Sequence, residues 1–305
     1  MYPYTERRHF CYLSRIVNIT MKTALFTIGP AGTGKTTFSS VFLDYVRANK
    51  INAYYMNLDP ATLDDEGRKI VTETVYDIRT DYDFLKCMSL YQLGPNGTLM
   101  KILHDFSVSK RLEEMCNNDY DFLIIDCPGQ IEAYTHDGYF NSIISSVKEC
   151  GYNVITLFTL DSTFLTNKAK LTSGLLIALY TMSQLDTPFV TIFTKMDLVR
   201  DDDELEEESL YDIFHNQLER VLDMKESQER QECQEQTVLE KSRDILDKFG
   251  TSCIIPVDIT DDQSISSLYI ELKKIYGNDE DDEDFDTGRE ADEEELDEPE
   301  PSFSF

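Results

Sequence analysis

The sequence lacks any apolar run long enough to span a lipid bilayer. Its longest apolar stretches, residues 154–160 and 175–182, fall well short of the roughly 18 to 20 residues that a transmembrane helix needs. It also lacks a Cys-x-x-Cys pair, and its seven cysteines are scattered, with no histidine at zinc-ligand spacing. We therefore expect no membrane partner, no disulfide scaffold and no structural zinc site.

Basic residues are scarce, at 28 against 58 acidic residues, and the net charge is -30. Two stretches, residues 201–208 and 279–300, together account for -21 of this charge. Direct nucleic-acid binding needs clustered Lys and Arg, and the whole surface offers no such excess, so we expect no nucleic-acid partner.

Both ends of the chain differ in composition from its body. Residues 1–21 hold three arginines and one acid, a bias seen in organelle-targeting leaders, but no apolar core or cleavage site follows. A disordered extension upstream of an alternative start at Met21 is the favoured interpretation. Residues 278–305 are predicted to be an acidic disordered tail, which leaves one domain over residues 22–277.

Apolar runs of strand length alternate with helix-length segments along this domain. Such alternation predicts a mostly parallel sheet covered by helices on both faces, in a three-layer α/β fold with ligands at the carboxyl edge of the strands. Residues 204–248 read as an inserted helical segment, with apolar positions at helical spacing. The expected strands span residues 24–28, 53–58, 122–125, 154–160, 189–193 and 253–257.

A glycine-rich loop follows the first expected strand and opens a helix that is predicted to run to about Asn49. This is the P-loop pattern in the context that it requires, and it predicts nucleotide phosphates held by backbone N–H groups and a helix N-terminus. Lys35 is expected to reach the β- and γ-phosphates, and Thr36 to bind Mg²⁺. The predicted nucleotide-binding residues of the loop are Gly29, Gly32, Thr33, Gly34, Lys35, Thr36 and Thr37.

Two further motifs lie at strand ends downstream. Asp126 begins Asp-Cys-Pro-Gly-Gln-Ile-Glu, in which Asp126 is expected to bind Mg²⁺ or its water and Gly129 to contact the γ-phosphate. Thr194, Lys195 and Asp197 belong to a Thr-Lys-Met-Asp segment that is similar to guanine-reading motifs. The Asp197 carboxylate would accept from two guanine donors, while the Lys195 stem would cover the base.

The order of the motifs resembles one GTPase family more closely than Ras-like switches. Gly94-Pro95-Asn96 matches the name-giving loop of the GPN-loop GTPases, and Asn-Leu-Asp-Pro-Ala at 57–61 and Asp-Ile-Arg at 77–79 also match. The resemblance covers about residues 22–276. Residues 91–93 and the acidic C-terminus look most like the RNA polymerase II-associated paralogue numbered one, whereas Thr-Lys-Met-Asp looks closer to another paralogue.

The resemblance implies a dimeric GTPase that uses GTP/GDP and Mg²⁺ and assists assembly or nuclear import of RNA polymerase II. It assigns water positioning or activation to Asp59, Gln130 and Glu132, and it places Asn96 across a dimer. The implied partners are a second GPN-loop GTPase, in a homodimer or heterodimer, and polymerase subunits or assembly factors. The implied location is the cytoplasm, with shuttling to the nucleus.

Two other functions stay open on the residues alone. A nucleotide-gated assembly or binding module with little hydrolysis would carry the same motifs, with the insertion and the acidic tail recruiting a client. A small-molecule kinase is less favoured, because no Arg-rich lid is evident in the sequence.

Overall fold

The structure is a computed structural model that describes residues 22–61, 74–116, 120–135, 138–198, 210–223 and 254–275. The predicted N-terminal extension (1–21) and acidic tail (278–305) lie outside these ranges. Of the predicted helical insertion (204–248), only residues 210–223 are described, and they form a helix.

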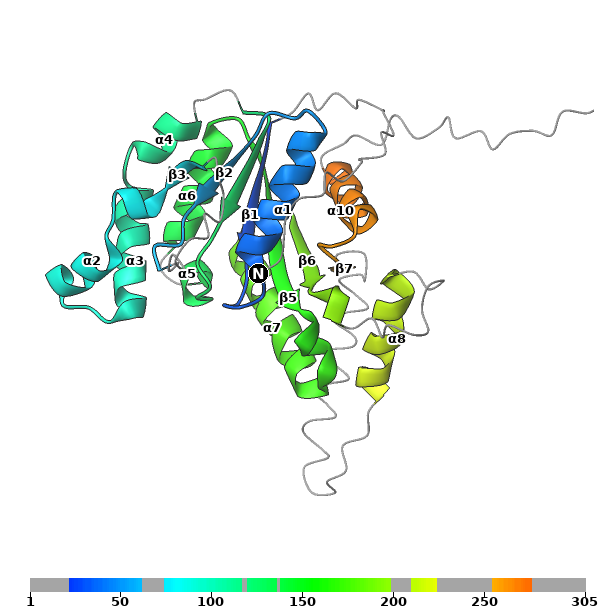
Figure 1. Ribbon diagram of the computed structural model, residues 1–305. Coiled ribbons are helices and arrows are strands. Elements are labelled where there is room, and N and C mark those ends of the chain that lie inside the picture. Colours follow the sequence, from blue (N-terminus) through cyan, green and yellow to red (C-terminus); the bar gives the residue numbers. More distant parts are fainter. Residues whose placement is uncertain are drawn as a thin grey trace, which may run out of the picture.

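The described strands form one seven-stranded sheet, in the order β3-β2-β4-β1-β5-β6-β7 (Figure 1). Every described pairing is parallel, so the carboxyl ends of all seven strands lie along one edge. The strands are β1 (Thr23–Ile28), β2 (Ala53–Asn57), β3 (Thr74–Asp77), β4 (Phe122–Asp126), β5 (Asn153–Asp161), β6 (Phe189–Thr194) and β7 (Ile254–Pro256).

Helices cover both faces of this sheet, which confirms the predicted three-layer fold. The α-helices are α1 (Lys35–Ala48), α2 (Phe84–Tyr91), α3 (Pro95–Ser107), α4 (Arg111–Cys116), α5 (Glu132–Thr135), α6 (Tyr139–Glu149), α7 (Lys168–Gln184), α8 (Leu210–Asp223) and α10 (Asp262–Lys274). Short 3₁₀ helices are η1 (Ile78–Thr80), η2 (Ser162–Thr166) and η3 (Met196–Leu198). None of the described helices is long and apolar enough to cross a bilayer.

Alternate residues of the central strands supply two separate cores. Phe26 of β1 faces a core built with α3, α5, α6 and α7, where its ring meets Phe140 edge-on at 5.6 Å between centroids. Leu25, its neighbour, faces the opposite core, in which Phe38 and Phe42 of α1 pack together with α10. Because strands buried on both faces need apolar residues at every position, the continuous apolar runs in the sequence identify them.

Strand β3 is the element that the sequence pattern did not predict. Its four residues, Thr-Val-Tyr-Asp, are too few and too polar at the ends to stand out as an apolar run. The strand lies at the edge of the sheet and pairs with β2 alone among the described strands. Its position matters, because Asp77 ends this strand at the same edge as the P-loop.

Helices α2 and α3 form an arm at one side of the molecule. Figure 1 shows α2 and the start of α3 projecting beyond the sheet, away from α1. All residues of the connection between them, 92–94, are exposed, and no residue of α2 is fully buried. The Gly-Pro-Asn sequence therefore lies at the tip of a projection rather than in the body of the domain.

Candidate functional site

The P-loop joins β1 to α1 in a conformation that requires glycine. Gly29, Gly32 and Gly34 all have positive φ values, of 137°, 83° and 83°. At Gly29 a Cβ atom would lie 2.5 Å from the carbonyl oxygen of Thr159, so this glycine also permits a close approach of the loop to β5. The loop's shape is thus set by its own sequence and by its contact with the sheet.

Lys35 is hydrogen-bonded to the backbone of this loop. Its Nζ donates to the carbonyl oxygens of Gly29 at 3.0 Å and Pro30 at 2.9 Å, and the residue is 7% exposed. Burial lowers the pKa of the Lys35 ammonium, and the carboxylates of Asp126 and Asp59 act in the opposite direction. The amine is therefore fixed where a phosphate would lie against the loop.

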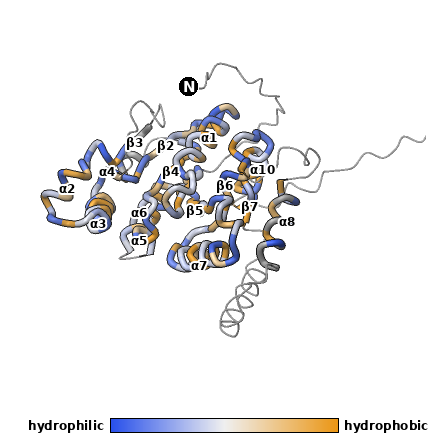
Figure 2. Tube along the Cα trace, turned by 60° about the horizontal axis from the view of Figure 1, so that its bottom comes forward, coloured by the Kyte–Doolittle hydropathy of each residue, from blue (hydrophilic) through white to orange (hydrophobic). Residues whose placement is uncertain are grey.

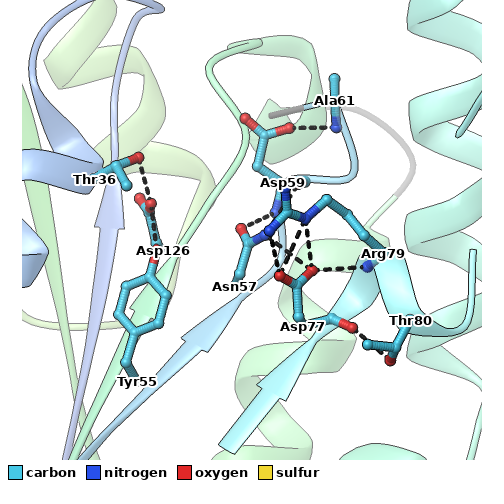
Figure 3. A network of polar contacts seen from close by, with 9 residues as sticks. All are labelled: Thr36, Tyr55, Asn57, Asp59, Ala61, Asp77, Arg79, Thr80 and Asp126. Carbon is cyan, nitrogen blue, oxygen red and sulfur yellow. Dashed lines mark hydrogen bonds and ion pairs between the residues drawn. The ribbon is translucent and has the colours of Figure 1, made fainter. Parts of the chain in front are cut away.

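Asp126 at the end of β4 is bonded to the first turn of α1. Its Oδ2 accepts from the Thr36 hydroxyl at 2.6 Å and from the Tyr55 hydroxyl at 2.8 Å (Figure 3). Burial raises the pKa of Asp126 to about 6, although the hydrogen bonds from Thr36 and Tyr55 and the charge of Lys35 act in the opposite direction. The structure thus brings together the two residues predicted to bind metal.

Two buried acceptor atoms near the P-loop have no donor. Among the described residues, Asp126 Oδ1 and Gln130 Oε1 are two of only three buried side-chain polar atoms without a hydrogen-bond partner. Buried acceptors are normally satisfied, and such exceptions call for a missing water or ion. A carboxylate oxygen and a threonine hydroxyl are ligands or water partners that Mg²⁺ accepts, so these residues fit the metal that the motifs imply.

Asp59 is held at the end of β2 by a network that reaches β3. The side chain of Asn57 accepts from Asp59 N at 2.9 Å and donates to Asp77 Oδ1 at 3.1 Å. Arg79 pairs with both oxygens of Asp77, its terminal nitrogen lying 2.6 Å from Oδ2. Burial acts to raise the pKa of Asp77, but the hydrogen bonds and charge of Arg79 keep that pKa below its usual value. Figure 3 shows this chain of contacts beside Thr36 and Asp126.

The Asp59 side chain itself has one oxygen committed to a turn. Its Oδ1 accepts from Ala61 N at 2.9 Å, as an aspartate before proline often does. The negative charge of Asp59 acts to raise the pKa values of both Lys35 and Asp126, so Asp59 lies near these two residues of the predicted phosphate site. Both a turn-bracing role and a water-positioning role are compatible with this geometry.

Gly129 brings the loop after β4 against the P-loop. A Cβ at this position would lie 2.8 Å from Ala31 Cα, so any side chain would push the two loops apart. Glu132, three residues later, is exposed at the start of α5, while Gln130 is partly buried. The predicted γ-phosphate contact and two of the three predicted water-handling residues therefore share one short segment beside the P-loop.

The Thr-Lys-Met-Asp segment after β6 is bonded directly to the P-loop. The Thr194 hydroxyl lies 2.6 Å from the carbonyl oxygen of Thr33, and Lys195 Nζ donates to the Gly32 carbonyl at 2.7 Å and to Asp161 Oδ2 at 3.1 Å. Lys195 has a φ of 57°, an unusual value for a residue with a side chain. Asp197 is exposed in η3, with its carboxylate available to a base.

Asn96 does not lie at the phosphate loop of its own chain. It occupies the second position of α3, where Gly94 is the N-cap and Pro95 the first residue, and it is exposed. In Figure 1 the arm that carries it stands apart from the P-loop at the start of α1. A role for Asn96 in another subunit's site stays a prediction.

Three residues of the site escaped the sequence motifs. Tyr55 looks like any other buried strand residue, and Thr159, whose Oγ1 lies 2.5 Å from that of Thr33, looks like a small core residue. Asp161 carried a usable signal, because it ends a long apolar strand at the ligand-binding edge of a parallel sheet.

Comparisons with known proteins agree with this geometry. Residues 27–278 match the sequence profile of a family described as "conserved hypothetical ATP binding protein". The chain is 30% identical over 257 residues to the GPN-loop GTPase 3 of Dictyostelium discoideum, covering 83% of this chain and 87% of that protein. The chain belongs to the GPN-loop GTPase family. The GPN-loop GTPase 3 of Danio rerio is also 30% identical, over 84% of this chain and 89% of its own.

A solved structure supports the fold of this GPN-loop GTPase. The crystal structure of a GTPase in apo form from Pyrococcus abyssi matches it with a TM-score of 0.63 and 17% identity, covering 84% of this chain and 98% of that chain. The predicted P-loop NTPase fold is confirmed by this likeness and by the parallel sheet.

The predicted likeness to the paralogue numbered one is wrong, since the relatives above are named GPN-loop GTPase 3. That prediction relied on residues 91–93 and on the acidic tail. Residues 91–93 are exposed at the tip of the arm, where substitutions disturb little packing, so they are weak markers. Thr194, which pointed to another paralogue, is buried and bonded to the P-loop.

Proposed function

We propose that this GPN-loop GTPase binds GTP with Mg²⁺ and hydrolyses it to GDP and phosphate as a dimeric nucleotide switch. The observation that carries the proposal is the pair of donorless buried acceptors, Asp126 Oδ1 and Gln130 Oε1, beside a formed P-loop. Both atoms can accept a hydrogen bond from water, one from a metal-bound water and the other from the attacking water.

In this mechanism the chain mostly positions the phosphates, the metal and the attacking water. Lys35 and the loop amides would hold the phosphates. Thr36 and Asp126 would hold Mg²⁺, which would supply positive charge to offset the negative charge of the phosphates. Gln130, with Glu132 and Asp59, orients the water whose oxygen bonds to the γ-phosphorus. The bond from that phosphorus to the bridging oxygen breaks and leaves its electron pair on GDP, and both protons of the water leave with the phosphate.

Substitution of the water-handling residues should separate binding from chemistry. We expect Gln130→Ala and Glu132→Ala to keep GDP affinity within about threefold and to slow GTP hydrolysis by about 100-fold, because water positioning acts in the transition state. Single-turnover hydrolysis of GTP and titration calorimetry with GDP measure the two effects. Gln184→Ala, at the end of α7, is the matched control and should change neither.

The same measurement tests the competing function, a nucleotide-gated assembly module with little hydrolysis. An unmodified chain that binds GTP tightly but leaves it intact over hours would favour that module and contradict the GTPase proposal. Equal loss of GDP affinity in the variants at Gln130 and Glu132 would instead make them binding residues.

The dimer in this proposal is supported by the apolar surface of the arm. Leu85, Leu90 and Leu93 are 72%, 74% and 39% exposed, and Leu93 directly precedes the Gly-Pro-Asn sequence. Figure 2 shows hydrophobic residues along α2, at the end of the molecule opposite α8. Exposed apolar clusters mark interaction surfaces, and the occupant that we propose is a second GPN-loop GTPase, identical or related.

A charge in this surface should break the dimer. We expect Leu90→Asp to convert a dimer into a monomer in the presence of a non-hydrolysable GTP analogue, while GDP affinity is kept. Light scattering after size-exclusion chromatography measures the mass. Ile270→Asp, which charges a half-exposed position on α10, is the control and should leave the dimer intact. A wild-type chain that is monomeric in all nucleotide states would refute a homodimer, and a mass unchanged by Leu90→Asp would refute this surface.

The client of the switch is proposed from the family resemblance alone. It consists of RNA polymerase II subunits or assembly factors, and the switch would assist polymerase assembly or nuclear import. The corresponding location is the cytoplasm, with shuttling to the nucleus.

A further inference from the structure

The Asp126 carboxylate is held by hydroxyl groups from two different elements. Thr36 approaches its Oδ2 from α1 at 2.6 Å, and Tyr55 approaches the same oxygen from β2 at 2.8 Å. Its other oxygen, Oδ1, is buried and has no donor. Figure 3 shows the three side chains in line, with the carboxylate between the two hydroxyl groups.

Strand register explains why Tyr55 can reach this carboxylate. In the parallel pairing of β2 with β4, Tyr55 lies beside Ile124, and Asn57 lies beside Asp126. Side chains two residues apart on neighbouring strands share a face, so the long Tyr55 side chain spans the gap along the strands. Tyr55 is 4% exposed, and its ring belongs to the core between the sheet and α1.

The two donors saturate one oxygen and leave the other free. A tyrosine hydroxyl has a single proton, and here Tyr55 gives it to Oδ2. The Thr36 hydroxyl likewise gives its proton to Oδ2, which leaves its own lone pairs available to a cation. With Thr36 alone, the carboxylate could rotate about its last bond and exchange its two oxygens; with both donors, that rotation would break two hydrogen bonds.

We propose that Tyr55 is a positioning residue, which locks the Asp126 carboxylate so that Oδ1 faces the water shell of the nucleotide-bound Mg²⁺. This role rests on the proposed function, since it presupposes that Asp126 serves the metal. Tyr55 touches neither the nucleotide nor the metal. It acts through Asp126, as outer partners of metal-binding side chains generally do.

The test is the metal affinity of the GDP-loaded full chain, which needs no turnover. Tyr55→Phe removes one oxygen and keeps the ring that packs in the core. We expect it to weaken Mn²⁺ binding to the GDP complex by about tenfold, measured by electron paramagnetic resonance of free Mn²⁺. Affinity for GDP in the presence of EDTA should stay within about twofold of the wild type.

Tyr76→Phe is the matched control. Tyr76 is also buried, on the next strand, and its hydroxyl donates to the Asp81 carboxylate at 2.9 Å, away from the P-loop. It should change neither affinity, and its melting temperature gauges what the loss of such a hydrogen bond does to stability alone.

Four outcomes would overturn the assignment. Equal Mn²⁺ affinity in Tyr55→Phe and the wild type would show that the hydroxyl does not position Asp126. An equal loss of GDP affinity with and without metal, or a comparable loss of Mn²⁺ affinity in Tyr76→Phe, would show a general structural effect. A wild-type GDP complex that holds no Mn²⁺ would overturn the proposed function itself, and with it the role of Tyr55.

Discussion

Replacing Lys35 with Met should lower the affinity for both GTP and GDP by about 100-fold or more. The ammonium is expected to donate charge-assisted hydrogen bonds to phosphate. Each contributes about 1.5 to 3 kcal/mol, and about 1.4 kcal/mol corresponds to a factor of ten. Met keeps most of the apolar stem, so the loss falls on the charge. Titration calorimetry with GTP and GDP measures the effect.

The same substitution should leave the nucleotide-free fold intact. Burial lowers the pKa of Lys35, because the charged amine loses hydration in the folded state. Replacing the amine removes this desolvation cost. We therefore expect a melting temperature equal to or above that of the wild type. Lys170→Ala, which removes an exposed lysine from the start of α7, is the control for charge alone. Nucleotide affinity unchanged in Lys35→Met would contradict the P-loop assignment.

Asp197→Ala should abolish the preference for guanine. Its carboxylate is expected to accept from two donors of the base, and each donor left unpaired in a bound complex costs about 1 to 3 kcal/mol. We expect the ratio of GTP to ATP affinity to fall by at least about 100-fold, with ATP affinity little changed. Competition of GTP and ATP against a fluorescent GDP analogue measures the ratio.

This result also decides between two descriptions of the relatives. The matching profile is described as ATP binding, whereas the curated relatives are named GTPases. Equal affinity of the unmodified chain for ATP and GTP would contradict guanine reading by Asp197. Asp186→Ala, in the exposed loop before β6, should leave the ratio unchanged.

Much of the fold could be predicted because a parallel sheet leaves a strong mark on its strands. β1, β2, β4, β5, β6 and β7 were all predicted, since strands buried on both faces read as continuous apolar runs. β3 was missed because an edge strand of four residues contains too little apolar sequence. The motifs at strand ends followed from the same topology, which brings Asp126 and Thr194 to the edge that carries the P-loop.

The contacts that hold these motifs could not be predicted. Tyr55 reaches Asp126 through the register of two strands that are far apart in sequence, and no local pattern encodes a register. The network from Asp59 to Arg79 likewise depends on the pairing of β2 with β3. Sequence motifs identify the residues that are expected to contact a ligand. The residues that hold those side chains in place are brought there by tertiary packing.

The bonds from Thr194 and Lys195 to the carbonyl oxygens of the P-loop have a consequence for how ligands leave. These hydrogen bonds join the segment that is predicted to read the base to the loop that is predicted to hold the phosphates. We therefore expect that neither can move far without displacing the other. The binding free energies of the guanosine part and the phosphate part of the nucleotide are then not independent of each other. Guanosine and free triphosphate each lack one half of the nucleotide, so we expect both to bind weakly. We expect GDP release to require the base contacts and the phosphate contacts to open together.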